Sequence, residues 1–168
     1  MSTGSGRPAA DPDCGADAPN HGTPFRIAWD TNCLIYFLEG AGAAAASDAA
    51  RRRHQYLRRQ MESFEAGERE CVLSTLVVAE MAAGLDDPQR LRHVAERLGS
   101  LRGLRWVDVT VDVALEAGRV RRRCGLTLAD AIHLASAHTA GAQAFLTNDR
   151  RLGAASSYLP VLVLDDVI

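Results

Sequence analysis

Four acidic residues attract attention because each lies beside or inside an apolar segment. Asp30 ends the run "FRIAWD", Glu80 interrupts "LVVAEMAAG", and Asp130 and Asp149 occur in "LADAIHLA" and "FLTND". An ionised carboxylate among apolar side chains is costly unless it is paired or bound to a metal. If the four acids share one crevice, they repel one another, and a divalent cation removes that conflict. Ligands that are all oxygen atoms suit Mg²⁺ or Mn²⁺.

Each acid also has an ordinary structural explanation. Asp30 precedes an apolar segment and is suitable as a helix N-cap. Asp130 follows Thr127 by three residues, which is the spacing of a capping box. Asp149 could be a turn residue, whereas Glu80 is harder to explain because its flanks are apolar on both sides. A metal site is therefore indicated by the four acids together and not by any one of them.

Apolar segments and helical patterns alternate along the chain after residue 24. Strands are predicted at 25–30, 70–74, 104–109, 142–149 and 159–167. From the spacing of apolar residues, helices are predicted between the strands, at 31–40, 48–68, 75–84, 87–103, 111–125 and 127–141. This alternation predicts an α/β fold, in which a central, mainly parallel sheet carries helices on both faces.

The predicted elements place all four acids at one edge of the sheet. Ligands of parallel sheets gather at the carboxyl ends of the strands. Asp30 ends the first strand, and Asp149 ends the fourth. Glu80 lies on the helix after the second strand, and Asp130 opens the helix that leads into the fourth. Helices that leave a shared edge can bring these side chains into one crevice.

Length and composition are those of one globular domain. The chain has 168 residues, 47% of them hydrophobic and 24% charged, and residues 25–168 are the predicted domain. Residues 1–24 are rich in Gly, Pro, Ala and Asp and have no apolar signal core, so we expect a disordered leader. No segment reaches the roughly 20 apolar residues that span a bilayer, so we expect no membrane partner. Scattered cysteines without a C-x-x-C pair favour a reduced, cytoplasmic protein.

Four sequence blocks resemble the PIN-domain nucleases, and most closely the VapC-type toxins of bacterial toxin–antitoxin pairs. They are, in order, "AWDTNCLIYFLEG", "LSTLVVAEMAAG", "GLTLADAIHLASA" and "AFLTND". The resemblance covers roughly residues 26–168 and implies a PIN-like three-layer sandwich with an acidic pocket for Mg²⁺ or Mn²⁺. It assigns catalysis and metal binding to Asp30, Glu80, Asp130 and Asp149, and the bracing of these acids to Asn32 and Thr147. By the same comparison, Asp165 and Asp166 lie outside the site.

The resemblance also implies an activity and partners. By this resemblance, the chain is expected to be a metal-dependent endoribonuclease that hydrolyses RNA phosphodiester bonds and is the toxin of a toxin–antitoxin system. A bound divalent ion would lower the pKa of the attacking water and stabilise charge on the phosphate, while a carboxylate accepts the proton. The implied partners are a VapB-type antitoxin that lies over the pocket and a second copy of the chain in a homodimer.

An anionic RNA backbone needs basic patches near the acidic pocket, because the formal net charge of the whole chain is −2. The candidates are the arginine-rich segments 51–59, 90–93 and 119–123. Each could equally be a solvated helix face. The last segment is favoured because it lies shortly before Asp130, and its arginines are Arg119, Arg121, Arg122 and Arg123. Aromatic residues make up only 5% of the chain, which favours recognition of RNA by shape and phosphate position.

Two other functions fit parts of the sequence. A phosphatase of the haloacid-dehalogenase type also has an aspartate after its first strand, but it needs a second acid two residues later. Here that position is Asn32, which disfavours the phosphatase. The remaining alternative is a catalytically silent PIN-like RNA-binding or regulatory module, which a Mn²⁺-dependent cleavage assay would distinguish. His133, three residues after Asp130, is expected to be a packed or hydrogen-bonded helix histidine and not a metal ligand.

Overall fold

The computed structural model describes residues 24–44, 47–84 and 87–168. Over these ranges the strands form one sheet in the order β3-β2-β1-β4-β5, and every neighbouring pair is parallel. The strands are β1 (Phe25–Trp29), β2 (Arg69–Ser74), β3 (Leu104–Val107), β4 (Ala144–Thr147) and β5 (Val161–Val163). The predicted parallel sheet is therefore confirmed.

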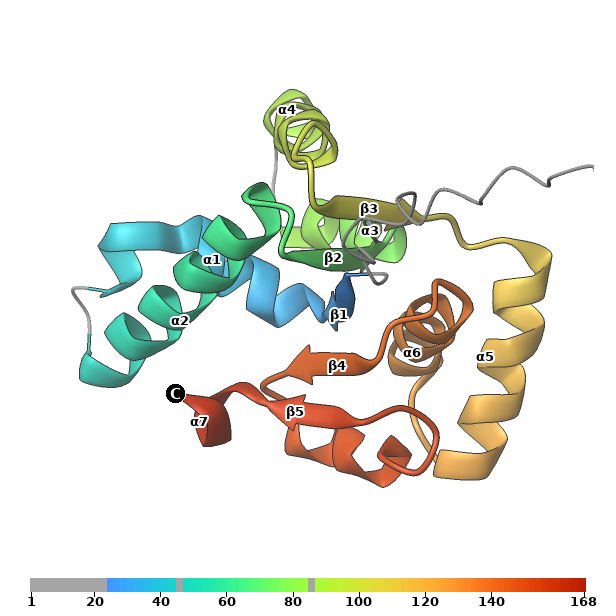
Figure 1. Cartoon of the computed structure of the whole chain (residues 1–168). Coiled ribbons are helices and arrows are strands. Elements are labelled where there is room, and N and C mark those ends of the chain that lie inside the picture. The colour runs from blue at the N-terminus through green and yellow to red at the C-terminus, as the bar shows by residue number, and fades with distance from the viewer. Residues whose placement is uncertain (1–23, 45–46, 85–86) are drawn as a thin grey trace, which may run out of the picture.

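Helices cover both faces of the sheet (Figure 1). One face carries α1 (Thr31–Ala44), α2 (Asp48–Glu65), α3 (Leu76–Gly84) and α4 (Pro88–Gly99). The other face carries α5 (Val111–Cys124), α6 (Leu128–Thr139) and the 3₁₀ helix η1 (Arg150–Ala155). This is the three-layer sandwich that the sequence predicted. None of the helices in the described residues is long and apolar enough to cross a bilayer.

The central strand β1 contributes to two separate cores. Successive residues of a strand point to opposite faces of the sheet. Ile27 and Trp29 lie in the core beneath α1 to α4, and Ala28 lies in the core beneath α5 and α6. Each of the three is at most 2% exposed. Because both faces of the sheet are buried, its strands read as continuous apolar runs in the sequence.

The chain departs from the prediction after β5. A strand was predicted over 159–167, but β5 ends at Val163 and a short helix, α7 (Leu164–Val167), follows. Two ion pairs hold this end of the chain. Arg53 of α2 makes two hydrogen bonds to Asp165, and Arg150 makes two to Asp166. The strand prediction from residue 164 onward is therefore wrong, because these acids have partners on α2 and η1 and not in the sheet.

Two other sequence predictions concern the end of the first helix and the expected leader. A helix was predicted to end at Gly40, but α1 continues to Ala44 across a kink at Gly40, where φ is 61° and ψ is −143°. Of the expected leader at 1–24, every residue except Pro24 lies outside the described residues. Cys33, Cys71 and Cys124, the cysteines within the described ranges, are free thiols.

Gly103, which precedes β3, is a position where the fold leaves no room for a side chain. A Cβ atom there would lie 2.7 Å from the carbonyl carbon of Phe64 and 2.8 Å from its Cα atom. The backbone of Gly103 is also held, because its carbonyl oxygen accepts a hydrogen bond from Cys71 N at 2.7 Å. The close approach of α2 to the loop before β3 therefore depends on this glycine.

Gly103→Ala is expected to lower the free energy of unfolding by about 1–3 kcal/mol, because overpacking at backbone atoms forces the backbone to shift. Gly118→Ala is the matched control. Gly118 lies inside α5, and apart from its chain neighbours and the backbone of its own helix a Cβ atom there would meet no described atom within 4 Å. This second change should raise the free energy of unfolding by about 0.5–1 kcal/mol, because glycine is a poor helix former. Urea unfolding measures both, and equal stabilities would contradict the prediction.

Candidate active site

Asp30 follows β1 and accepts hydrogen bonds from three neighbours. Its Oδ1 atom accepts from Thr31 N at 2.8 Å. Its Oδ2 atom accepts from Asn32 Nδ2 at 2.9 Å and from Thr147 Oγ1 at 2.6 Å. The residue is 9% exposed, and burial raises the pKa of its carboxyl above the usual value, against the lowering effect of the Thr147 hydrogen bond. Repulsion from Glu80 raises it further.

Glu80 is linked to Asp30 through Thr31. Thr31 N donates to Asp30, while Thr31 Oγ1 donates to Glu80 Oε2. The same Oε2 atom lies 2.9 Å from Nε2 of His133 on α6. The hydrogen bond from His133 lowers the pKa of the Glu80 carboxyl, and it outweighs the opposing effect of partial burial. With its side chain 33% exposed, Glu80 is an ionised carboxylate that solvent can reach. This explains how an acid is accommodated in an apolar helix.

Thr147, the last residue of β4, links Asp30 to Asp149. Its hydroxyl donates to Asp30 and accepts a hydrogen bond from Asp149 N at 3.0 Å. The Asp149 carboxylate caps η1 by accepting from Arg151 N at 2.9 Å, and it also pairs with the Arg151 guanidinium. This ion pair lowers the pKa of the Asp149 carboxyl. Asp149 is therefore an ionised acid with a positive charge beside it.

Asp130 opens α6 and makes one of the two bonds of the capping box that its spacing predicted, while its carboxylate binds the Thr127 hydroxyl and not Thr127 N. Asp130 N donates to Thr127 Oγ1 at 3.2 Å, and the Thr127 hydroxyl donates to Asp130 Oδ2 at 2.7 Å. Asp149 and, to a smaller extent, Asp130 raise the pKa of the Arg151 guanidinium. Arg151 is thus a positive charge that is paired with Asp149.

The structure places the four predicted acids along one edge of the sheet without drawing them into a tight cluster. Within residues 24–44, 47–84 and 87–168, no three His, Cys, Asp or Glu side chains are spaced to hold one metal ion. Two of the acids have local partners, Thr127 for Asp130 and Arg151 for Asp149. The joint metal site of the four acids therefore stays a prediction.

The residues at this edge nevertheless fit a divalent cation chemically. Their side chains offer carboxylate oxygens, which are the donors that Mg²⁺ and Mn²⁺ prefer. Asp30 is a buried acid whose charge is disfavoured mainly by burial, and a nearby cation would stabilise that charge. The ion pair between Arg151 and Asp149 shows that a positive charge is accepted at this edge.

The two residues expected to brace the acids form the hydrogen bonds that this role requires. Asn32 and Thr147 both donate to Asp30, and Asn32 Oδ1 also accepts from Asn148 N at 3.3 Å. The sequence prediction missed Thr31, which bridges Asp30 and Glu80. Its position directly after Asp30, at the start of a helix, was the available signal. His133 is hydrogen-bonded, as expected, and its partner proves to be a carboxylate.

The arginines proposed for RNA binding differ in how they are engaged. Arg119 pairs with Glu116 at 2.9 Å. Arg121, Arg122 and Arg123 are exposed in the last turn of α5 and make no ion pair with another described residue. Their charges are therefore available to an anionic ligand, whereas that of Arg119 is partly used within the helix.

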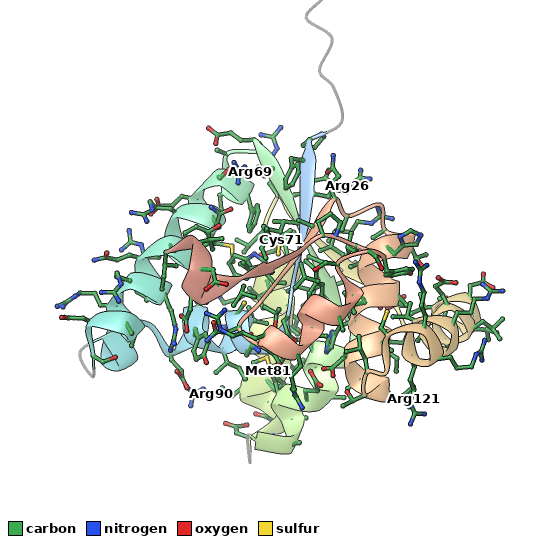
Figure 2. The ribbon with its side chains drawn as sticks, turned by 90° about the horizontal axis from the view of Figure 1, so that it is seen from below. Arg26, Arg69, Cys71, Met81, Arg90 and Arg121 are labelled. Carbon is green, nitrogen blue, oxygen red and sulfur yellow. The ribbon has the colours of Figure 1, made fainter. Side chains whose placement is uncertain are left out.

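Arginines lie at both the amino and the carboxyl edge of the sheet. Arg26 and Arg69 lie at the amino ends of β1 and β2, at the top of Figure 2. Arg90 and Arg121 lie at the opposite side of the molecule, which is also the side of Met81 on α3 (Figure 2). Positive charge from α4 and α5 thus lies on the side where the acids are placed.

A groove of about 350 Å³ begins beside Glu80 and runs between α1, α3 and α4. Its lining is mainly apolar, with charged residues at Glu39, Glu80 and Arg90. Ile35 and Leu38 of α1 contribute side chains that are 36% and 38% exposed. The groove thus offers apolar surface next to one of the candidate catalytic acids.

The sequence matches the PIN domain family over residues 27–157. Among curated protein sequences, none matches this chain significantly. Similar solved structures include a toxin–antitoxin complex from Klebsiella pneumoniae, with 20% identity, a TM-score of 0.54 and coverage of 82% of this chain and 97% of that chain. VapBC2 from Rickettsia felis, bound to a DNA fragment from its promoter, has 14% identity and a TM-score of 0.59. The match covers 83% of this chain and 98% of that chain. FitAcB from Neisseria gonorrhoeae has 20% identity and a TM-score of 0.57, and the match covers 82% of this chain and 97% of that chain. These likenesses show the fold.

Proposed function

This chain belongs to the PIN-domain family of nucleases, and we propose that it is a metal-dependent endoribonuclease that hydrolyses RNA phosphodiester bonds. We further propose that it is a VapC-type toxin of a toxin–antitoxin pair and acts in the cytoplasm. One observation supports this most strongly, a chain of hydrogen bonds at the carboxyl edge of the sheet. It connects acids from three segments of the chain through two threonines, in the order Glu80, Thr31, Asp30, Thr147 and Asp149. Thr31 uses its hydroxyl toward Glu80 and its backbone N–H toward Asp30, and Asp149 joins through its backbone N–H.

The proposed chemistry divides among the acids according to their surroundings. A divalent cation held by Asp30, Glu80, Asp130 and Asp149 would activate water and stabilise negative charge on the phosphate. Asp30 is fixed by three donors, so its role is to hold position and charge. Glu80 is the candidate proton acceptor, because it is ionised and partly exposed. Water or RNA can reach it without rearrangement of the core.

We assign the attraction of RNA to exposed arginines that lie outside the group of four acids. Arg121, Arg122 and Arg123 project from the end of α5, and α6, which carries Asp130, begins a few residues later. Neutralising backbone phosphates releases bound counterions, so RNA affinity should fall as salt rises. Arg119 is expected to contribute less because it pairs with Glu116.

Two protein partners are proposed. A VapB-type antitoxin would place an apolar segment in the groove beside Glu80, where Ile35 and Leu38 are partly exposed. A second copy of the chain would form a homodimer, and α5 exposes apolar surface at Val111 and Leu115, which are 76% and 60% exposed. The mass of a single chain in sedimentation at micromolar concentration would contradict the dimer.

The test of the proposed function is cleavage of a structured RNA by the purified full chain. Fragments should appear with Mn²⁺ or Mg²⁺ and disappear when a chelator is added. Induced expression without an antitoxin should arrest growth of the host. A duplex DNA of matched length, assayed in parallel, tests the preference for RNA.

The alternative is a catalytically silent RNA-binding or regulatory module. Such a protein would bind RNA in a gel-shift assay whichever metal ion is present, and it would produce no RNA fragments. If binding without cleavage is observed for a correctly folded sample, the endoribonuclease proposal is wrong. The exposed arginines would then be the functional feature, and the acids would have only structural roles.

A further inference from the structure

His133 of α6 joins three parts of the fold at a buried point. Its Nε2 atom lies 2.9 Å from Glu80 Oε2 on α3 and 3.4 Å from Thr31 Oγ1 at the start of α1. The residue is 3% exposed. At such a buried position the protein neighbours of the ring determine where its hydrogen lies.

The neighbours decide which nitrogen of the ring carries a hydrogen. Thr31 Oγ1 donates its hydrogen to Glu80 Oε2, so it presents only lone pairs to the ring. The ionised carboxylate of Glu80 accepts hydrogen bonds and cannot donate them. Both atoms that face Nε2 are therefore acceptors, and Nε2 must carry the hydrogen and donate it to Glu80. Nδ1 of His133 is buried and has no hydrogen-bond partner among the described residues.

The two donors act on the same oxygen of Glu80. Oε2 accepts from both Thr31 and His133, and no hydrogen bond from a described residue reaches Oε1. Two donors on different helices, α1 and α6, restrict the rotation of the Glu80 side chain. The other oxygen is then left for a ligand, on a side chain that is one-third exposed.

We propose that His133 is a positioning residue of the active site, which together with Thr31 fixes Glu80 through Oε2 and leaves Oε1 for the divalent cation and the attacking water. This inference rests on the proposed nuclease function. It assigns a role in the site to a residue that is neither one of the four acids nor one of the residues predicted to brace them.

Packing alone does not account for a histidine at this position. An apolar side chain of similar size would fill the same space without a polar atom. Nδ1 has no hydrogen-bond partner among the described residues, so the polar contact of the ring with its protein surroundings is made by Nε2. The polar function of the ring is therefore directed at Glu80.

Three variants separate positioning from packing. His133→Leu keeps the bulk and removes the donor, whereas His133→Gln keeps a donor, because its Nε2 amide reaches as far as the imidazole Nε2. His138→Gln is the matched control, since His138 is an exposed residue of the same helix. Mn²⁺ affinity is measured by calorimetry on the full chain, and cleavage is measured on a structured RNA.

His133→Leu is expected to weaken Mn²⁺ affinity and to slow cleavage by roughly 10- to 100-fold each, the usual effect of removing a group that orients a metal ligand. His133→Gln should restore most of both, and His138→Gln should match the unchanged protein. The inference is overturned if His133→Leu binds Mn²⁺ as tightly as the unchanged chain, or if His133→Gln is as impaired as His133→Leu.

A spectroscopic measurement tests the hydrogen assignment without metal or RNA. Nitrogen NMR of the ¹⁵N-labelled full chain should show the His133 hydrogen on Nε2, and Glu80→Gln should shift that resonance. A hydrogen found on Nδ1 would overturn the inference even if the leucine variant fails to fold. If the unchanged chain cuts no RNA, the proposed function fails, and the Mn²⁺ affinities and the NMR spectra still decide the role of His133.

Discussion

Asp30→Asn is expected to reduce cleavage of RNA by about 100- to 1,000-fold, the size of effect that follows removal of one preorganised charged group at a reacting centre. Asp30 is the best-held acid of the site, with hydrogen bonds from Thr31, Asn32 and Thr147. The substitution keeps the shape of the side chain and removes its negative charge. The rate should fall at every Mn²⁺ concentration if the charge is needed for catalysis as well as for binding.

The same substitution should leave the fold intact. Burial already disfavours the charged form of Asp30, as its raised pKa shows, so a neutral side chain is tolerated at this position. The amide oxygen can still accept one of the hydrogen bonds, and the Thr147 hydroxyl can reverse to accept one from the amide. The NH₂ group of the new asparagine then faces one donor that it cannot bind, either Asn32 Nδ2 or Thr31 N. This mismatch should lower the free energy of unfolding by about 1 kcal/mol. Loss of activity in this variant therefore reports on chemistry and not on unfolding.

Asp87→Asn is the control for Asp30→Asn. Asp87 also precedes a helix, and its carboxylate accepts from Gln89 N and Arg90 N at the start of α4. Asparagine is an equally good N-cap, so this change should alter neither stability nor cleavage. A single-turnover assay with quantified fragments measures both variants. If Asp30→Asn cuts RNA at the rate of Asp87→Asn, the assignment of the site is wrong.

The sequence could predict those features of the candidate site that depend on position along the chain. The apolar segment before Asp30 predicts a strand, and the carboxyl end of a parallel strand is where ligands bind. The spacing of Thr127 and Asp130 predicted a capping box, and the structure contains its bond from Asp130 N to Thr127 Oγ1, with the Asp130 carboxylate accepting from the Thr127 hydroxyl. The bonds from Asn32 and Thr147 followed from the resemblance to a family. Each of these is local, or is fixed by strand order.

Other contacts could not be predicted, because they join residues that are distant in sequence and depend on side-chain direction. Thr31 and Glu80 are 49 residues apart, and Glu80 and His133 are 53 apart. No spacing rule relates such pairs, and only the packing of α1, α3 and α6 brings them together. The helix α7 was missed for the same reason, since its acid Asp165 pairs with Arg53 at a separation of 112 residues.

Mn²⁺ is expected to raise the melting temperature of the full chain. A ligand that binds only the folded state stabilises it by about 2.7 kcal/mol when its free concentration is 100 times Kd. For a domain of this size each kcal/mol shifts the melting temperature by about 2–4 °C, so a rise of roughly 5–11 °C is expected. The unfolded chain separates the acids and should bind the ion weakly. The rise should therefore follow the Mn²⁺ concentration and disappear with a chelator.

Asp149 and Asp166 provide a matched pair of variants for this measurement. Each is an acid paired with an arginine of η1, Arg151 for Asp149 and Arg150 for Asp166. Only Asp149 is joined through Thr147 to Asp30. The Mn²⁺-induced rise should therefore shrink strongly in Asp149→Asn and stay unchanged in Asp166→Asn. Equal shifts in the two variants would show that Mn²⁺ binds elsewhere on the chain, because the neutralised charge is the same in both and only its place differs.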